Sequence, residues 1–183
     1  MSRSGGAPRI LAGRWKGRAL KVPRPARPTS SRAREALFDI LQDRVRGGRF
    51  LDLYAGSGAV GLEALSRGAR ASVFVEIDSR ALENNLARVA AGPEEFEIVR
   101  EDARAAVSAL ARRGETFDVV FADPPYSLDA AVSKKIGGLL APAGRLVLQT
   151  DSGASAPEFP GLFLSERRAY GRNVFWFFVE TRP

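Results

Sequence analysis

The stretch 50–61, Phe-Leu-Asp-Leu-Tyr-Ala-Gly-Ser-Gly-Ala-Val-Gly, constrains the fold of this chain more than any other. It predicts a buried strand that runs into a glycine turn and then into a helix. Gly56, Gly58 and Gly61 follow the pattern Gly-x-Gly-x-x-Gly, which lets a backbone approach a ligand closely at the positive end of the next helix. Because plain turn glycines satisfy the same pattern, other residues must decide whether a ligand binds there.

Two carboxylates accompany the glycine turn. Asp52 lies at the end of the first apolar run, and Glu76 closes the next one. A carboxylate in the position of Glu76 suits ribose hydroxyls in both NAD and S-adenosylmethionine folds. Asp52 favours S-adenosylmethionine, because an anion there would repel a pyrophosphate and attract an ammonium and a sulfonium. The alternative is that Asp52 only accepts local backbone hydrogen bonds.

Apolar runs and helical patterns alternate along the chain. Candidate parallel strands are at 50–54, 71–77, 96–99, 117–122 and 145–149, and candidate helices near 58–67, 79–91, 103–113 and 129–140. This alternation predicts an α/β, doubly wound, mostly parallel sheet that gathers ligands at the carboxyl ends of its strands. The runs 162–164 and 174–179 flank a turn around Gly171, which predicts an antiparallel hairpin that finishes the sheet.

The N-terminal quarter has a different pattern. Residues 9–13 and 16–22 predict two short strands of a basic hairpin around Arg14 and Trp15. Thr29 or Ser30 then caps a predicted helix that ends near residues 47–48. We therefore expect a basic extension over residues 1–48 and a catalytic domain over residues 49–183.

Charge is concentrated in the same quarter. Residues 1–50 hold 13 Lys and Arg against 3 Asp and Glu, whereas the remainder holds 15 against 18. A local excess of this kind is typical of a nucleic-acid contact, although a charge run is often only a solvated face.

Two residue types are missing from the chain, which contains no cysteine and no histidine. Disulfides, zinc–cysteine sites and thiol nucleophiles are therefore excluded, and general-base chemistry near neutral pH must use other groups. We expect no metal. No apolar run is long enough to cross a bilayer, and the N-terminus lacks an apolar signal segment, so a cytoplasmic protein is expected.

The fourth predicted strand ends in Asp123, Pro124, Pro125 and Tyr126. The two prolines supply no N–H, so the carbonyls there are free to accept hydrogen bonds from a ligand. A carboxylate beside a backbone carbonyl matches the two hydrogens of an exocyclic amine, and the Tyr126 ring offers a face for a base. The alternative is a rigid turn in which Asp123 caps the following helix.

Taken together, these motifs resemble the RsmD family of bacterial 16S rRNA guanine-N2 methyltransferases. The resemblance runs from about residue 9 to 180 and is carried by segments 9–18, 27–29, 34–38, 51–63, 74–76 and 123–126. It implies a class I S-adenosylmethionine-dependent methyltransferase fold, Rossmann-like, with seven strands and an antiparallel last strand. It also implies methylation of the exocyclic N2 amine of a guanine, of the guanine(966)-N2 type, in the small ribosomal subunit.

The resemblance also implies roles for individual residues. The turn would hold the methionine part of S-adenosylmethionine, Glu76 the ribose, and Ile77 and Asp102 with Ala103 the adenine. Arg27 and Thr29 would form a lid on the cofactor side, and Arg14, Lys16 and Arg18 would contact 16S rRNA, in a small-subunit assembly intermediate. The target amine would meet Asp123, Pro124, Pro125 and Tyr126. The members of the cofactor-binding turn are Asp52, Tyr54, Ala55, Gly56, Ser57 and Gly58, with Asp123 adjoining the cofactor.

Two other functions compete with this interpretation. An adenine-N6 DNA methyltransferase uses the same amine chemistry, but such enzymes usually carry a sizeable target-recognition domain that 183 residues do not accommodate. A catalytically silent RNA-binding module on the same fold would bind RNA without responding to S-adenosylmethionine, and the presence of Asp52, Glu76 and Asp123 argues against it.

Overall fold

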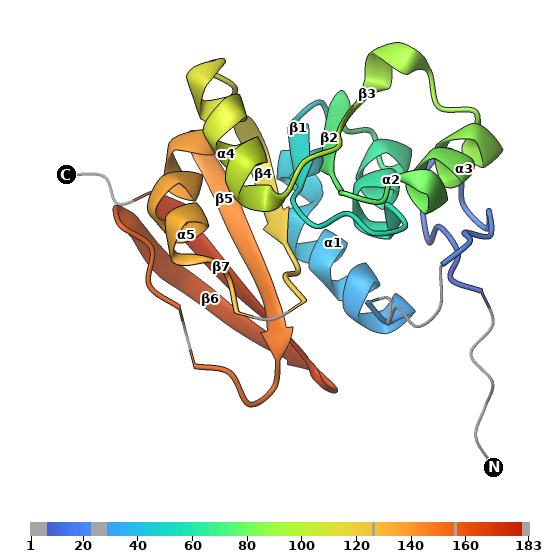
Figure 1. The fold of residues 1–183 in the computed structure, drawn as a ribbon. Helices are drawn as coiled ribbons and strands as arrows, with labels where there is room; N and C mark the ends of the chain where they lie inside the picture. The colour runs from blue at the N-terminus through green and yellow to red at the C-terminus, as the bar shows by residue number, and fades with distance from the viewer. Residues whose placement is uncertain (1–6, 23–28, 126, 156, 181–183) are drawn as a thin grey trace.

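The computed structural model describes residues 7–22, 29–125, 127–155 and 157–180, and it forms one α/β unit. Its elements alternate as the sequence predicts from residue 49 onward (Figure 1). They are α1 (Ser31–Val45), β1 (Arg49–Asp52), α2 (Ala59–Ser66), β2 (Ala71–Val75), α3 (Arg80–Val89), the 3-10 turn η1 (Pro93–Glu95), β3 (Phe96–Val99), α4 (Ala103–Arg112), β4 (Phe117–Ala122), α5 (Ala130–Lys135), the 3-10 turn η2 (Ile136–Leu139), β5 (Leu140–Asp151), β6 (Leu162–Tyr170) and β7 (Asn173–Glu180).

The seven strands form a single sheet in the order β3-β2-β1-β4-β5-β7-β6. Strands β1 to β5 are parallel, whereas β7 runs antiparallel to both β5 and β6. The predicted doubly wound sheet and its antiparallel end are thus confirmed. The strand order reverses between β1 and β4, and ligands bind at such a reversal in open α/β sheets.

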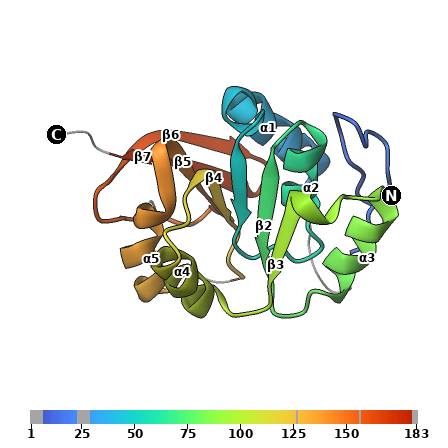
Figure 2. The same ribbon diagram turned by 90° about the horizontal axis from the view of Figure 1, so that it is seen from above.

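Helices cover both faces of the sheet (Figure 2). One core layer lies under α1, α2 and α3 and includes Phe38, Phe74 and Phe175. The other lies under α4 and α5 and includes Val107, Ile136 and Phe178. Because β1, β2 and β4 are largely buried on both faces, their sequences are nearly continuous apolar runs, which is why these strands could be located from the sequence.

The two arms of the hairpin predicted at residues 9–22 pair antiparallel, but they form no regular strands. The pairing consists of one bridge, between Arg9 and Ala19, and of backbone hydrogen bonds such as the one from Ile10 N–H to the Arg18 carbonyl at 3.0 Å. The reason is competition for backbone hydrogen bonds, because the Glu63 carboxylate accepts the N–H groups of Leu11 and Ala12 at 2.8 and 3.0 Å. Gly13 has a φ of 79°, and a Cβ there would lie 1.7 Å from the Ser66 carbonyl oxygen. The segment therefore packs on α2 instead of completing its own ladder.

Several element boundaries also differ from the prediction: β1 ends at Asp52 instead of 54, and β6 extends from Leu162 to Tyr170 instead of ending at 164. The helix expected over 129–140 is α5 followed by the 3-10 turn η2, and β5 begins at Leu140 instead of 145. The strand expected over 71–77 ends at Val75, before Glu76. These shifts leave the carboxyl ends of the strands, where the candidate site lies, close to their predicted places.

Candidate active site

The candidate site lies at the carboxyl ends of β1 and β4, where the strand order reverses. Asp52 ends β1 and pairs in register with Phe121, and Asp123 follows Phe121 by two residues, directly after the end of β4. A cavity of about 130 Å³ opens between them. The lining residues come from four separate parts of the chain: Val22, Thr29, Asp52, Tyr54, Ala55, Gly56, Ser57, Ala59, Val60, Phe121 and Asp123.

The turn after β1 has an unusual backbone. Tyr54 has a φ of 140°, a region that non-glycine residues rarely occupy, and such strain is often found at functional sites. Gly56 and Gly58 have φ values of 54° and 76°. A Cβ on Gly58 would lie 2.4 Å from a Leu82 methyl group, whereas one on Gly56 would meet no atom within 4 Å. Gly58 is therefore needed for packing, and Gly56 for the shape of the turn.

Asp52 is buried, with 2% of its surface exposed. Its Oδ2 accepts the Gly61 N–H at 2.9 Å, so the local hydrogen bond considered from the sequence is present. Burial raises the pKa of Asp52 to about 7; the Gly61 N–H opposes this shift, and the nearby Asp123 and Glu76 carboxylates add to it. A carboxylate kept from water beside two others would gain strongly from a bound cation.

Glu76 holds the rim of the same turn. Its Oε2 accepts the Gly56 N–H at 2.7 Å, and its Oε1 accepts the Asp78 N–H at 3.1 Å. The next residue, Ile77, is 71% exposed, an unusually large exposure for an isoleucine. An exposed apolar side chain next to a fixed carboxylate offers a surface for a flat ring beside a polar contact for hydroxyls.

Asp102 lies three residues after the end of β3 and caps α4. Its Oδ1 accepts the N–H groups of Arg104 and Ala105 at 2.9 and 3.0 Å. The side chain is exposed, and its Oδ2 makes no hydrogen bond within the described residues. Ala103 begins α4 and is buried in the core, so its side chain serves packing.

Asp123 does not cap the helix that follows it. Asp129 does so, accepting the Ala131 and Val132 N–H groups. Instead, Asp123 Oδ2 accepts from Gln149 Nε2 at 3.0 Å, and Gln149 Oε1 accepts from the Thr29 hydroxyl at 2.9 Å. Burial raises the pKa of Asp123 to about 7, and the charge of Asp151 adds to this shift.

The sequence analysis missed Gln149, a polar residue of the site, as well as the lining residues Val22, Ala59, Val60 and Phe121. Gln149 lies on β5 and is 6% exposed, so it is a buried polar side chain at the end of an apolar strand. The polar pair Gln149-Thr150 after Leu146-Val147-Leu148 is the sequence feature that could have located it.

Of the remaining residues predicted to meet the target amine or the cofactor, the structure describes Pro124 and Pro125. Pro124 follows Asp123 at the rim, and no donor within the described residues occupies its carbonyl oxygen. Pro125 is exposed. Tyr126 and Arg27 lie outside the described residues.

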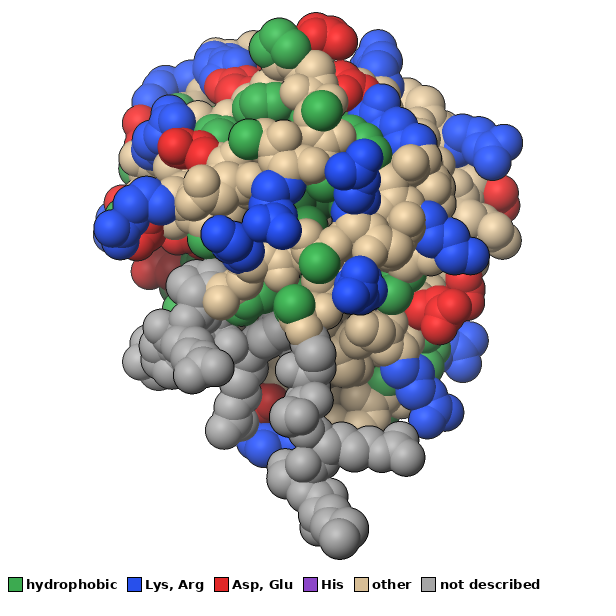
Figure 3. Space-filling view, turned by 90° about the vertical axis from the view of Figure 1, so that its right-hand side faces the viewer, with side chains coloured by type: hydrophobic (Ala, Val, Ile, Leu, Met, Phe, Trp, Pro, Cys, Tyr) green, Lys and Arg blue, Asp and Glu red, His purple; other side chains and the backbone are tan. Residues whose placement is uncertain are grey.

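The basic residues of the N-terminal segment are exposed but not equivalent. Arg14 forms an ion pair with Glu95 at 2.5 Å and lies over the Trp15 ring. Lys16 and Arg18 form no side-chain hydrogen bond or ion pair within the described part of the chain. Figure 3 shows the face on the right of Figure 1, over which many Lys and Arg side chains are distributed. Lys16 and Arg18 are thus the two members of the predicted set that are available to an anionic partner.

The described ranges contain no group of three or more Asp, Glu, His or Cys side chains arranged to hold a metal ion. None of their helices is both long and apolar enough to cross a membrane.

Relatives of the chain were found by sequence. A Bacillus subtilis (strain 168) protein named "Putative rRNA methyltransferase YlbH" is 34% identical over 178 residues, which cover 89% of this chain and 94% of that protein. Ribosomal RNA small subunit methyltransferase D of Escherichia coli (strain K12) is 43% identical over 123 residues. That match covers 64% of this chain and 60% of the relative, somewhat less than two thirds of its length.

The structural and family comparisons agree with these matches. The structure of hypothetical protein TTHA0928 from Thermus thermophilus superposes with a TM-score of 0.82 and 42% identity, over 96% of this chain and all of that one. Residues 8–179 match the family described as Conserved hypothetical protein 95. The chain belongs to that family, which is the RsmD family that its motifs resemble.

Proposed function

We propose that this protein transfers a methyl group from S-adenosylmethionine to the exocyclic N2 amine of a guanine in 16S rRNA, of the guanine(966)-N2 type. The observation that carries the proposal is the acceptor pair at the end of β4. Asp123 Oδ2 is held by Gln149, and the Pro124 carbonyl accepts nothing within the described residues. Two acceptors beside a cavity lined by a second buried carboxylate suit an amine that becomes positively charged as it reacts.

The residues around the cavity fit S-adenosylmethionine. The buried Asp52 carboxylate and the strained turn at Tyr54 would hold its charged methionine part, and Glu76 its ribose. Exposed Ile77 and the free oxygen of Asp102 would meet the adenine. The cavity of about 130 Å³ suits the methionine end, with the adenosine lying along the outer rim. When bound, this cofactor supplies an electrophilic methyl carbon on a sulfonium.

The protein's own contribution is positioning and charge. A guanine amine is a weak nucleophile, because its lone pair is delocalised into the ring. Hydrogen bonds from its two hydrogens to Asp123 and the Pro124 carbonyl would let the nitrogen pyramidalise and expose the lone pair. As the new N–C bond forms and the methyl–sulfur bond breaks, the positive charge that develops on nitrogen lies beside the Asp123 carboxylate. The surplus proton then leaves to Asp123 or to solvent, so no histidine or cysteine is required.

The RNA substrate is supported by the relatives and by charge. The Escherichia coli relative is named a ribosomal RNA small subunit methyltransferase, and Lys16 and Arg18 are exposed cations without partners in the described ranges. We place the reaction in a small-subunit assembly intermediate within the cytoplasm. The two alternative functions are those of a DNA adenine-N6 methyltransferase and of a catalytically silent RNA-binding module. The experiment must distinguish the proposal from both.

One parallel assay tests the proposal. Purified protein is incubated with labelled S-adenosylmethionine and one of three substrates in separate reactions: naked 16S rRNA, small-subunit assembly intermediates or duplex DNA. Methylated RNA is digested, and its modified nucleosides are identified by mass spectrometry. We expect N2-methylguanosine from one of the two ribosomal substrates and no label in DNA. Label in DNA as N6-methyladenine, or RNA binding without any transfer, would overturn the proposal in favour of one of its competitors.

A further inference from the structure

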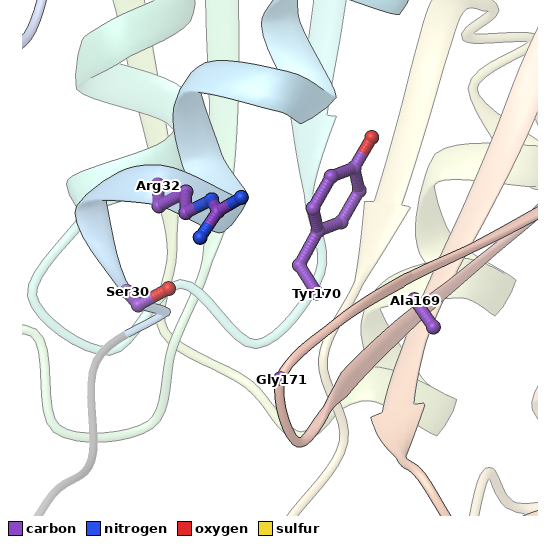
Figure 4. A pocket seen from close by; sticks show the side chains of 5 residues that line it. All are labelled: Ser30, Arg32, Ala169, Tyr170 and Gly171. Carbon is purple, nitrogen blue, oxygen red and sulfur yellow. The ribbon is translucent and has the colours of Figure 1, made fainter.

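A second, larger pocket lies beside the candidate site. It has a volume of about 280 Å³ and is lined by Ser30, Arg32, Ala169, Tyr170 and Gly171. It lies between the first turn of α1 and the turn that joins β6 to β7 (Figure 4). The Arg32 and Tyr170 side chains lie on opposite sides of it. Neither the motifs nor the relatives assign a role to this pocket.

The pocket adjoins the candidate site through two consecutive residues, although the two cavities have no lining residue in common. Thr29 lines the smaller cavity and hydrogen-bonds Gln149, which in turn holds Asp123, and the next residue, Ser30, lines the larger pocket. The sheet also connects Gln149 to the pocket. Gln149 lies on β5 two residues before Asp151, and Asp151 is paired with Asn173 of β7. Asn173 is in turn paired with Tyr170 of β6. Strand spacings of about 7 Å along β5 and about 10 Å across the sheet separate Gln149 from Tyr170. The pocket is therefore close enough to the proposed target position to receive the nucleotide next to the target guanine.

The chemistry of the lining suits a nucleotide. Arg32 is exposed and forms no ion pair within the described residues, and no acidic residue lines the pocket. The first turn of α1 also contains no acidic residue, so its positive end is not neutralised. The Tyr170 ring lies against Phe175 at 6.0 Å between centroids, and its hydroxyl has no hydrogen-bond partner in the described ranges. A guanidinium opposite a supported aromatic ring is a pair that binds single-stranded RNA, through phosphate and base respectively.

We propose that this pocket binds the nucleotide adjacent to the target guanine, with Arg32 on its phosphate and the Tyr170 ring against its base. The inference rests on the proposed function, which supplies the RNA and the position of the target. It adds a reason why a loop nucleotide stays extruded, because stacking of its neighbour on Tyr170 would offset part of the cost of unstacking.

The test compares Arg32→Ala, Tyr170→Ala and Tyr170→Phe with the wild type. Arg112→Ala serves as the control, because Arg112 is an exposed arginine at the far end of α4. A synthetic stem-loop of 16S rRNA that presents the target guanine is prepared intact and with an abasic residue on either side of the target. RNA affinity, S-adenosylmethionine affinity and single-turnover methyl transfer are measured separately.

We expect Tyr170→Ala and Arg32→Ala to weaken RNA binding by about 10-fold while cofactor affinity is unchanged. Tyr170→Phe and Arg112→Ala should remain close to the wild type. An abasic residue on one side should weaken the wild type but not Tyr170→Ala, because the stacking partner is already missing.

Equal RNA affinity in the wild type, Arg32→Ala and Tyr170→Ala would overturn the inference. The inference would also be overturned if each abasic residue lowered the RNA affinity of the wild type and of Tyr170→Ala by the same factor. A wild type that binds RNA but methylates none would instead overturn the proposed function, and the binding comparison would still decide the role of the pocket.

Discussion

At the scale of single residues, one buried carboxylate, Asp52, and one partly buried carboxylate, Asp123, set the chemistry of the site. Asp52 and Asp123 lie at the ends of adjacent strands, and burial raises the pKa of each to about 7. An ionised carboxylate is costly in such a place, and a bound cation would offset that cost. The two carboxylates therefore lower the stability of the free protein and raise its affinity for a positively charged ligand.

The first prediction concerns this trade at Asp52. The folded-state pKa lies above the unfolded value, so the folded protein binds the additional proton, and stability falls as pH rises from about 4 to 7. Asp52→Asn removes that loss while its amide oxygen can still accept the Gly61 N–H. We expect a melting temperature about 2–6 °C above the wild type at pH 8, and a smaller difference at pH 5. Thermal unfolding across this pH range checks the prediction, and a difference that grows toward low pH would contradict it.

Gln149 carries the second prediction, because it holds one oxygen of Asp123. Its N–H donor stabilises the ionised carboxylate, so Gln149→Leu should move the rise of methyl transfer with pH toward higher pH. We also expect transfer at pH 7 to fall by about 10-fold, as is typical when a residue that orients a reacting group is lost. Single-turnover rates from pH 5.5 to 9 provide the measurement. A reduced rate with an unshifted profile would mean that Gln149 serves only packing.

At the scale of elements, the N-terminal segment is anchored by a buried charge cluster on α2. Glu63 is fully buried and accepts from Leu11, Ala12 and Arg67. Arg34 of α1, also fully buried, lies 3.7 Å from Glu63 and donates to the Arg9 carbonyl. Burial lowers the pKa of Arg34, and the Glu63 carboxylate opposes that shift. The cluster therefore joins the basic segment, α1 and α2 into one body.

The third prediction is that Glu63→Gln destabilises the protein by about 3–5 kcal/mol, because the Arg34 charge would be left buried without a partner. Urea unfolding provides the measurement. Glu35→Gln is the control, since Glu35 is an exposed carboxylate on α1 without an ion pair in the described residues. Equal stability of Glu63→Gln and the wild type would show that the cluster does not hold the segment.

The same cluster explains what the sequence could and could not predict. Residues such as Asp52 and Glu76 were found because they interrupt apolar strands at their carboxyl ends, which is a local pattern. The predicted N-terminal hairpin lacks regular strands because Leu11 and Ala12 bond to Glu63, more than fifty residues away, and no local pattern encodes that contact. Gln149 was missed for a related reason, since its role depends on Thr29 and Asp123, which only the fold brings together.

At the scale of the whole molecule, positive charge and the candidate site occupy connected surfaces. The segment with Lys16 and Arg18 packs on the last turn of α2, where the Trp15 N–H donates to the Ser66 hydroxyl. The segment continues to Val22, which lines the cavity near the other end of α2. An RNA held by Lys16 and Arg18 would therefore have to follow this segment to reach the site. Since Arg14 is already paired with Glu95, its share in RNA binding should be smaller than that of its neighbours.

The fourth prediction follows from this difference. The double variant Lys16→Ala and Arg18→Ala should weaken RNA binding. It should also reduce the slope of log affinity against log salt concentration by about one to two, because each lost phosphate contact reduces that slope by about 0.7 to 0.9. Arg14→Ala should change the slope less. Titrations at several salt concentrations provide the slopes, and an unchanged slope in the double variant would mean that this segment does not touch the RNA.

Single-turnover methyl transfer by Asp123→Ala tests the central claim most directly. The control is Asp43→Ala, because Asp43 is an exposed carboxylate on α1 without an ion pair in the described residues. With saturating RNA and S-adenosylmethionine, the account predicts that N2-methylguanosine formation by Asp123→Ala falls by about two orders of magnitude. Cofactor-induced stabilisation should persist in that variant, and Asp43→Ala should react like the wild type. Transfer by Asp123→Ala at close to the wild-type rate would contradict the assignment of Asp123 as the acceptor of the target amine.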